Sequence, residues 1–311
     1  MNLPSIIFFG TPRFAAEILK ILIVHHIPIA AVVTQPDRPK GRSLQVSESP
    51  VKEVATRELP DTPILQPAKA SELEFLTRLE SFSGDLYVVV AFGQILPQKL
   101  LDIPRLGCIN VHASLLPKYR GAAPIQRCLL NGERETGVCI QKMIKQLDAG
   151  DVIAEKKISI PSEMTGGELE QKLCELSKPL LLSVLEAYGI GFPAATPQDL
   201  DQVTFAPKIE PEEGEIHWAK GAEELHNLIR AFNPRPGAWC WVALDGVKKR
   251  LKIHRAIVVD QRGDAGSILS KKEGVIACGN GALKLIEVQP EGKPRMAGVD
   301  WLRGCTGTVS F

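Results

Sequence analysis

Residues 108–117 read Cys-Ile-Asn-Val-His-Ala-Ser-Leu-Leu-Pro, and this stretch decides both the fold and the position of its chemistry. Its apolar start predicts a strand over Cys108–Val111, with Asn110 and His112 two residues apart at the end. On a strand, that spacing points both side chains to one face, roughly 6.6–6.8 Å apart along the chain. Open α/β sheets bind ligands at the carboxyl ends of their strands, so we expect this pair to face a binding site.

A carboxylate that can orient the imidazole follows in the segment Leu147-Asp148-Ala149-Gly150-Asp151. An amide, an imidazole and a carboxylate suffice to move an acyl group without a covalent enzyme intermediate. Asp is also favoured in Gly-containing turns for local reasons, and the residues alone leave Asp148 and Asp151 as alternatives. Ser114 lacks the GxSxG context of a nucleophile, and Cys108 carries no signal of activation.

Strands and helices alternate along the first part of the chain, which predicts a parallel, Rossmann-like α/β sheet. The expected strands are Ser5–Phe9, Ile29–Thr34, Pro60–Gln66, Leu86–Phe92, Cys108–Val111, Gly137–Met143 and Val152–Ile160. The first expected helix begins at Phe14. Three more are expected over Ser71–Leu79, Gly121–Leu130 and Thr165–Tyr188, and Thr165 and Glu168 form a capping box at the start of the last.

The last third of the chain has a different pattern. Gly191–Gly214 is rich in Pro, Gly and charge and is interpreted as a linker. One helix follows over Ala222–Phe232, and then five short strand-like runs separated by Gly-containing turns predict a small OB-like β-barrel. These runs are Ala238–Leu244, Lys249–Val258, Ala265–Ser270, Gly274–Ala277 and Leu283–Val288. The predicted domains are therefore 1–190, the linker 191–214 and 215–311.

Several functional classes lose support from the sequence. Phe9–Ala15 has one Gly and a Pro where a dinucleotide fold has GxGxxG, so Gly10-Thr11-Pro12 is interpreted as a strand-to-helix turn with Pro12 first in the helix. The seven Cys form no CxxC pair, and the six His show no ligand spacing, so we expect no metal and reduced thiols. The chain shows no signal peptide and no span of about 20 apolar residues, so we expect a cytoplasmic protein with no membrane contact, by default a monomer.

Charge is unevenly distributed although the net charge is only +1. Residues 1–216 hold 22 Lys/Arg against 27 Asp/Glu, while residues 217–311 hold 15 against 9. The segment Lys248–Arg255 contains five cations, which indicates either contacts to phosphates or a solvated strand face. The basic segment Gln35–Ser43 is expected to be a mobile loop, either a plain connection or one that reaches a polyanion.

Five segments together resemble the methionyl-tRNA formyltransferase family of folate-dependent formyltransferases, and the likeness extends over essentially the whole chain. They are Gly10–Pro12, Gln35–Arg38, Ser49–Lys52, Asn110–Gln126 and Leu147–Asp151. The resemblance implies 10-formyltetrahydrofolate as co-substrate and the α-amino group of charged initiator methionyl-tRNA as acceptor. It also implies a formyltransferase catalytic domain followed by a tRNA-binding barrel.

The resemblance also assigns residues. Asn110, His112 and Asp148 match the catalytic positions, which favours Asp148 over Asp151. The remaining matches are Ser114, Leu115, Leu116 and Pro117 for folate binding, Ala91–Pro97 for the pterin pocket, and Arg42 for the loop that meets the tRNA acceptor end. With Lys248, Lys249 and Arg250, Arg42 forms the predicted tRNA-binding set. After Arg42 this chain has Ser43–Glu48, which is less basic than the family loop.

Three other functions remain as alternatives. The same chemistry could serve a sugar-nucleotide or glycinamide ribonucleotide acceptor, could release formate to water, or could be lost in a non-catalytic RNA-binding protein. The basic C-terminal region and Arg42 favour tRNA as the acceptor.

Overall fold

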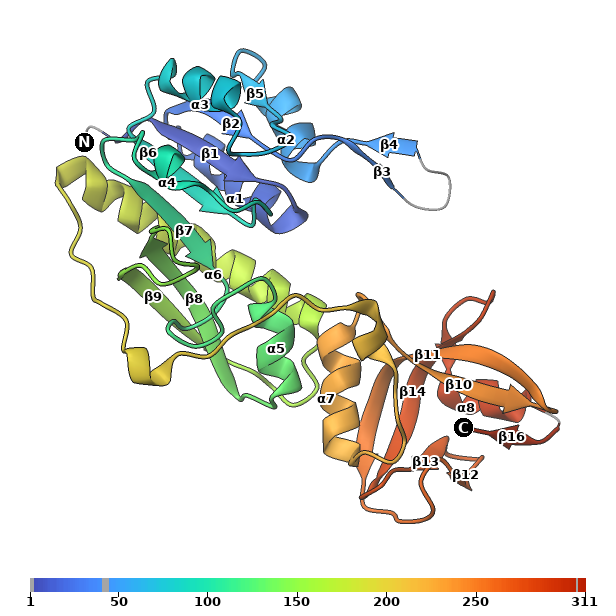
Figure 1. Cartoon of the computed structure of the whole chain (residues 1–311). Coiled ribbons are helices and arrows are strands. Elements are labelled where there is room, and N and C mark those ends of the chain that lie inside the picture. The colour runs from blue at the N-terminus through green and yellow to red at the C-terminus, as the bar shows by residue number, and fades with distance from the viewer. Residues whose placement is uncertain (1–2, 41–44, 306) are drawn as a thin grey trace. The chain divides into compact units, whose positions relative to one another are not determined.

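The computed structural model describes residues 3–40, 45–305 and 307–311, and its contacts divide the chain into two compact units (Figure 1). Unit 1 comprises Met1–Gly121, Thr136–Ile158 and Glu170–Phe205, and unit 2 comprises Ala122–Glu135, Ser159–Leu169 and Ala206–Phe311. Within the described ranges, no helix combines the length and the apolar character needed to span a bilayer. Arg42 lies outside the described residues.

Unit 1 is built on a seven-stranded sheet in the order β5-β2-β1-β6-β7-β8-β9. Pairing is parallel from β5 to β7 and antiparallel between β7 and β8. The predicted α/β sheet is confirmed, with an antiparallel edge that hydrophobic periodicity cannot reveal because it carries no strand direction. The strands are β1 Ile6–Gly10, β2 Ile29–Val33, β5 Ile64–Leu65, β6 Leu86–Val90, β7 Cys108–His112, β8 Glu135–Lys142 and β9 Val152–Ser159.

Helices connect these strands and cover the sheet (Figure 1). They are α1 Arg13–Val24, α2 Pro50–Glu58, α3 Leu73–Glu80, α4 Gln98–Leu101, α5 Pro124–Leu130 and α6 Gly166–Ile190, of which α5 and the start of α6 belong to unit 2. Pro12 is the N-cap of α1 and not its first residue, which corrects the prediction by one position. The capping box is confirmed, because the Glu168 carboxylate accepts from the Thr165 N–H and the Thr165 hydroxyl accepts from the Glu168 N–H.

The core of unit 1 follows the two-residue period of its strands. Ile7 and Phe9 of β1 and Tyr87 and Val89 of β6 lie in one buried cluster with apolar side chains of α3 and α4. The Phe9 ring stands 5.4 Å from the Tyr87 ring and 5.5 Å from the Phe92 ring between centroids. Gly10 is the last residue of β1. Glycine is required there because a Cβ would approach the Ala15 side chain and the Val90 carbonyl too closely.

Part of the segment Gln35–Ser43, expected to be a mobile loop, forms a short strand. Strand β3 (Arg38–Lys40) pairs antiparallel with β4 (Gln45–Ser47). Just before it, the Asp37 carboxylate binds the Lys52 ammonium and the Gln66 amide, which fixes the start of the hairpin on unit 1. The Lys52 ammonium and the Gln66 amide hold the pKa of Asp37 below its ordinary value.

Unit 2 carries the predicted barrel, an antiparallel sheet in the order β12-β13-β14-β11-β10-β16, with β15 paired to β14. Its helix α7 occupies Ala222–Phe232, as predicted, and Leu225 and Phe232 on its inner face are fully buried. The remaining elements are η1 Leu200–Gln202, η2 Pro211–Gly214, β10 Ala238–Leu244, β11 Val247–Val259, β12 Ile268–Ser270, β13 Val275–Ala277, β14 Ala282–Pro290, β15 Met296–Ala297, α8 Gly298–Arg303 and β16 Val309–Ser310; η1 belongs to unit 1. Hairpin connections dominate this unit, in contrast to the crossovers of unit 1.

Phe9→Ala should lower the free energy of unfolding by about 3–5 kcal/mol, because it removes a fully buried ring and leaves a cavity against Tyr87 and Phe92. The control is Phe192→Ala, whose ring is 72% exposed and whose loss should cost no more than about 0.5 kcal/mol. Urea unfolding followed by far-ultraviolet circular dichroism measures both. Equal losses in the two variants would contradict this account of the core.

Candidate functional site

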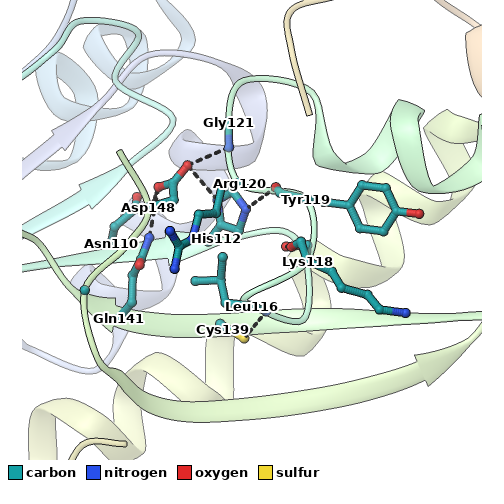
Figure 2. A network of polar contacts seen from close by, with 12 residues as sticks. Asn110, His112, Leu116, Lys118, Tyr119, Arg120, Gly121, Cys139, Gln141 and Asp148 are labelled. Atoms are coloured by element: carbon teal, nitrogen blue, oxygen red, sulfur yellow. Dashed lines mark hydrogen bonds and ion pairs between the residues drawn. The ribbon is translucent and has the colours of Figure 1, made fainter. Parts of the chain in front are cut away.

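Asn110 and His112 lie at the carboxyl end of β7, where the sequence placed them (Figure 2). Strand β7 lies between β6, to which it is parallel, and β8, to which it is antiparallel. His112 is 5% exposed, whereas Asn110 is half-buried. The strand geometry thus turns an amide and an imidazole toward the same edge of unit 1.

The Asp148 carboxylate meets both side chains and has further partners of its own (Figure 2). Its Oδ2 accepts from the Gly121 backbone N–H at 2.8 Å and lies 3.7 Å from His112 Nδ1. Its Oδ1 accepts from Gln141 Nε2 at 2.9 Å and from Asn110 Nδ2 at 3.4 Å. The structure therefore brings together the three predicted side chains and selects Asp148 over Asp151 as the partner of His112.

The loop that carries Asp148 has a constrained backbone. Asp148 has φ of 48°, a left-handed conformation that Asp tolerates better than most residues. Gly150 packs so closely on the Lys142 carbonyl that a Cβ would overlap the oxygen. At the base of the loop, the Lys142 N–H donates to the Asp151 carbonyl at 2.9 Å. These features restrict the backbone of the loop that carries the carboxylate.

The His112 ring is anchored through its other nitrogen. Nε2 lies 2.9 Å from the Tyr119 carbonyl oxygen, which can only accept, so Nε2 carries a proton. Nδ1 is then the ring atom that faces Asp148. The 3.7 Å separation is too long for a direct hydrogen bond, so Nδ1 remains free to bond a third group.

The segment after β7 is held mainly by internal contacts. The Ser114 hydroxyl is fully buried and donates to the Lys118 carbonyl at 2.7 Å. The Leu116 side chain is buried, and its N–H donates to Cys139 Sγ at 3.3 Å. Leu115 and Pro117 are half-buried and are the two predicted folate-binding residues whose side chains retain accessible surface.

Three large apolar side chains are exposed in the Asp148 loop and in the segment after β6. Leu147, next to Asp148, is 61% exposed, and Ile144 in the same loop is 49% exposed. Ile95, in the segment that follows β6, is 87% exposed. These side chains leave apolar surface open to a ligand or to solvent.

Two amide side chains of this site were missed by sequence reasoning. Gln141 is 1% exposed and lies opposite Asn110 across the β7–β8 pair; a polar residue within an apolar strand was its only sequence signal. Gln198 donates from Nε2 to the Asp148 carbonyl at 2.9 Å. It comes from the Pro-rich segment predicted as a linker, which has no periodicity that could reveal it.

The basic segment of unit 2 lies on strand β11, with Leu251 and Ile253 fully buried between charged neighbours. The alternation predicted for a half-buried strand is confirmed. Lys248 Nζ lies 4.8 Å from the centre of the Trp241 ring, and the Arg250 guanidinium lies 3.8 Å from the centre of the Trp239 ring. Lys248 and Lys249 are exposed, whereas Arg250 is half-buried.

Two family models match the chain. The model described as formyl transferase covers residues 4–185, and the model described as formyl transferase, C-terminal domain, covers residues 208–306. A curated relative, the methionyl-tRNA formyltransferase of Protochlamydia amoebophila, is 49% identical over 303 residues, which cover 96% of this chain and 95% of that protein.

Solved structures share the fold at low sequence identity. HypX from Aquifex aeolicus in complex with tetrahydrofolic acid aligns with a TM-score of 0.66 at 16% identity, covering 97% of this chain and 47% of that one. An N-formyltransferase from Helicobacter canadensis, in complex with folinic acid and dTDP-3-aminofucose, also aligns with a TM-score of 0.66 at 16% identity. It covers 93% of this chain and 100% of that one.

The Cys139 thiol, which lies beside the site, should not react with thiol reagents in the folded protein. Burial raises the pKa of Cys139 to about 12, so very little of this thiol is ionised at pH 8. We expect Ellman's reagent at pH 8 to leave Cys139 unmodified in the native protein, as shown by peptide mass mapping. In urea, where burial is lost, all seven Cys should react. Rapid modification of Cys139 in the folded chain would contradict the packing described around Leu116.

Proposed function

The chain belongs to the formyl transferase family, and on that premise we propose that it transfers the formyl group of 10-formyltetrahydrofolate to the α-amino group of methionyl-tRNA. The observation that carries the proposal is the convergence of Asn110, His112 and Asp148 at one sheet edge. The 49% identity to a methionyl-tRNA formyltransferase, over 96% of this chain, supports the choice of acceptor. The amine attacks the formyl carbon directly, the bond from that carbon to N10 breaks, and a proton passes from the amine to N10.

The residues at the site suit a folate donor. Such a donor supplies an activated formyl group on a nitrogen beside a planar pterin ring. The exposed side chains of Ile95, Ile144 and Leu147 offer apolar surface for such a ring. Leu115 and Pro117 can add contacts from the segment after β7, while Ser114 and Leu116 would act by shaping that segment from inside. We assign Ala91–Pro97 and Ser114–Pro117 to donor binding.

His112 and Asn110 would stabilise the charge that develops on the formyl oxygen during attack. The Tyr119 carbonyl holds His112 Nε2–H, so in the imidazolium form Nδ1–H is the donor directed at the substrate. The Asn110 amide makes only a long contact to Asp148, at 3.4 Å, so it can turn to the same oxygen at little cost. Preorganised donors of this kind are each worth on the order of 10²–10³ in rate.

Asp148 would take part in the transfer of the proton from the attacking amine. Two firm hydrogen bonds, from Gly121 and Gln141, orient its carboxylate before substrate arrives. Held there, it stabilises a protonated His112 and can accept the proton that the amine releases. Carbonyl-stabilising donors and a proton acceptor then meet around one reacting carbon.

The acceptor would be recognised largely outside this centre. We assign residues 1–190 to catalysis, 191–214 to the linker and 215–311 to tRNA binding, with Lys248, Lys249, Arg250 and Arg42 as phosphate contacts. The excess of six positive charges in residues 217–311 supports this division, because tRNA affinity depends mainly on phosphate charge. We place the enzyme in the cytoplasm, acting as a monomer on initiator tRNA.

The test is formylation of charged initiator tRNA with 10-formyltetrahydrofolate, followed by acid gel electrophoresis of the product. Uncharged tRNA, an amino sugar nucleotide and glycinamide ribonucleotide serve as competing acceptors. Product on charged tRNA supports the proposal. Release of free formate, or faster transfer to a small amine, would replace it by hydrolysis or by another acceptor.

His112→Ala and Asp148→Asn should each lower kcat by about 10²–10³ with little change in KM, because each removes an interaction that forms as charge develops. Asp151→Asn is the matched control, since it changes a carboxylate three residues away and leaves the Asp148 contacts intact. Steady-state formylation gives both constants. Wild-type turnover by a folded His112 or Asp148 variant would remove these residues from the mechanism.

A double variant, Lys248→Ala with Lys249→Ala, should weaken tRNA binding and flatten its dependence on salt. The slope of log K against log salt should become shallower by about one for each lost phosphate contact. The control changes Lys271 and Lys272, an exposed pair elsewhere in unit 2, to Ala. Filter binding across a salt series measures the slopes. Identical slopes for wild type and the first double variant would place the phosphate contacts elsewhere.

A further inference from the structure

Residues 196–204, here called the strap, run alongside the catalytic loop within unit 1. Thr196 and Val152 exchange two backbone hydrogen bonds, at 2.8 and 2.9 Å, which attach the strap to the strand after the loop. At the other end, Thr204 Oγ1 accepts from the Tyr119 N–H at 2.8 Å. The Thr204 carbonyl accepts from the Arg120 N–H at 2.9 Å. The strap therefore touches both segments that carry the site.

Between these anchors, the Gln198 side chain binds the catalytic loop directly. Its Nε2 donates to the Asp148 carbonyl at 2.9 Å and to the Gly150 carbonyl at 2.7 Å. Its Oε1 accepts from Arg120 Nε at 3.0 Å and from Arg120 Nη2 at 2.8 Å. Because a guanidinium only donates and a carbonyl only accepts, these partners allow only one orientation of the amide.

These contacts bear on the strained part of the loop. Asp148 adopts φ of 48°, and the two carbonyls that Gln198 holds belong to Asp148 itself and to Gly150. A backbone conformation of this kind persists only where its surroundings fix it. Arg120 is 2% exposed, and its side chain bonds the Gln198 oxygen, so the amide rests on a buried, rigid support.

We propose that Gln198 is a positioning residue for formyl transfer, which holds the Asp148 carboxylate in register with His112 by clamping the backbone of its loop. This inference rests on the proposed function. Gln198 contacts no reacting atom in this role and acts mainly through the Asp148 and Gly150 carbonyls. Its Nε2 also makes a long contact, at 3.4 Å, to Oε1 of Gln141. Misplacement of a catalytic group by about 1 Å costs on the order of 10² in rate, which sets the expected scale.

Gln198→Glu is the sharpest variant. The carboxylate keeps an acceptor for the buried Arg120, but it replaces the N–H by an oxygen that the Asp148 and Gly150 carbonyls repel. We expect kcat for formylation to fall about 10- to 100-fold, with KM for the donor within about twofold and the melting temperature lowered less than in Gln198→Ala. Gln198→Ala should lose both kcat and thermal stability, because it also strips Arg120 of its acceptor. Gln202→Ala, an exposed strap residue that bonds only Asp199, should behave as wild type.

A double-mutant cycle with Asp148→Asn separates positioning from a general structural effect. If Gln198 acts through Asp148, the double variant should be little slower than Asp148→Asn alone. Multiplied losses, or a kcat for Gln198→Glu within about twofold of wild type, overturn the inference and leave the proposed function standing.

Amide hydrogen exchange of the 143–152 peptide supplies a readout independent of activity. Exchange should be faster in Gln198→Glu than in wild type and unchanged in Gln202→Ala. Unaltered exchange in Gln198→Glu counts against the clamp. A wild-type protein that fails to formylate charged tRNA counts against the proposed function instead, while the exchange measurement still tests the clamp.

Discussion

The hydrogen bonds that hold the Asp148 carboxylate are the constraint on which the site depends. Gly121, from the segment after β7, and Gln141, from β8, reach it through firm contacts. A carboxylate that is 89% removed from solvent requires such donors, because an unpaired buried charge is costly. The fold of unit 1 satisfies this requirement by bringing two neighbouring strands and their loops to one edge, and His112 and Asn110 gain a fixed partner as a result.

Much of the architecture could be predicted because burial imposes periodicity. Helix α7 and strand β10 have the bounds that the apolar spacing indicated. Helix α2 was missed, since its sequence is mostly polar and only Val51, Val54 and Ala55 are buried. The antiparallel direction of β8 was missed for a different reason: a strand shows the same alternation whichever way it runs.

The site residues, too, could be predicted only where local spacing determines their position. The i, i+2 spacing of Asn110 and His112 gave their common face from local geometry alone. Asp148 could be separated from Asp151 only by family resemblance, because both sit in the same turn, and the contacts of the folded chain now select it. The amides of Gln141 and Gln198 act through partners distant in sequence, and no pattern in their own neighbourhoods encodes those contacts.

The close approach of Gly150 to the Lys142 carbonyl bears on how such chains can diverge. A loop closed at its base by the Lys142–Asp151 bond and packed without room for a methyl group cannot absorb an inserted or deleted residue and keep its carboxylate in place. Selection should remove insertions and deletions there and tolerate them in the surface turns of the barrel. Related enzymes that act on other formyl acceptors would then differ in the surrounding segments, while the loop between β8 and β9 keeps its length.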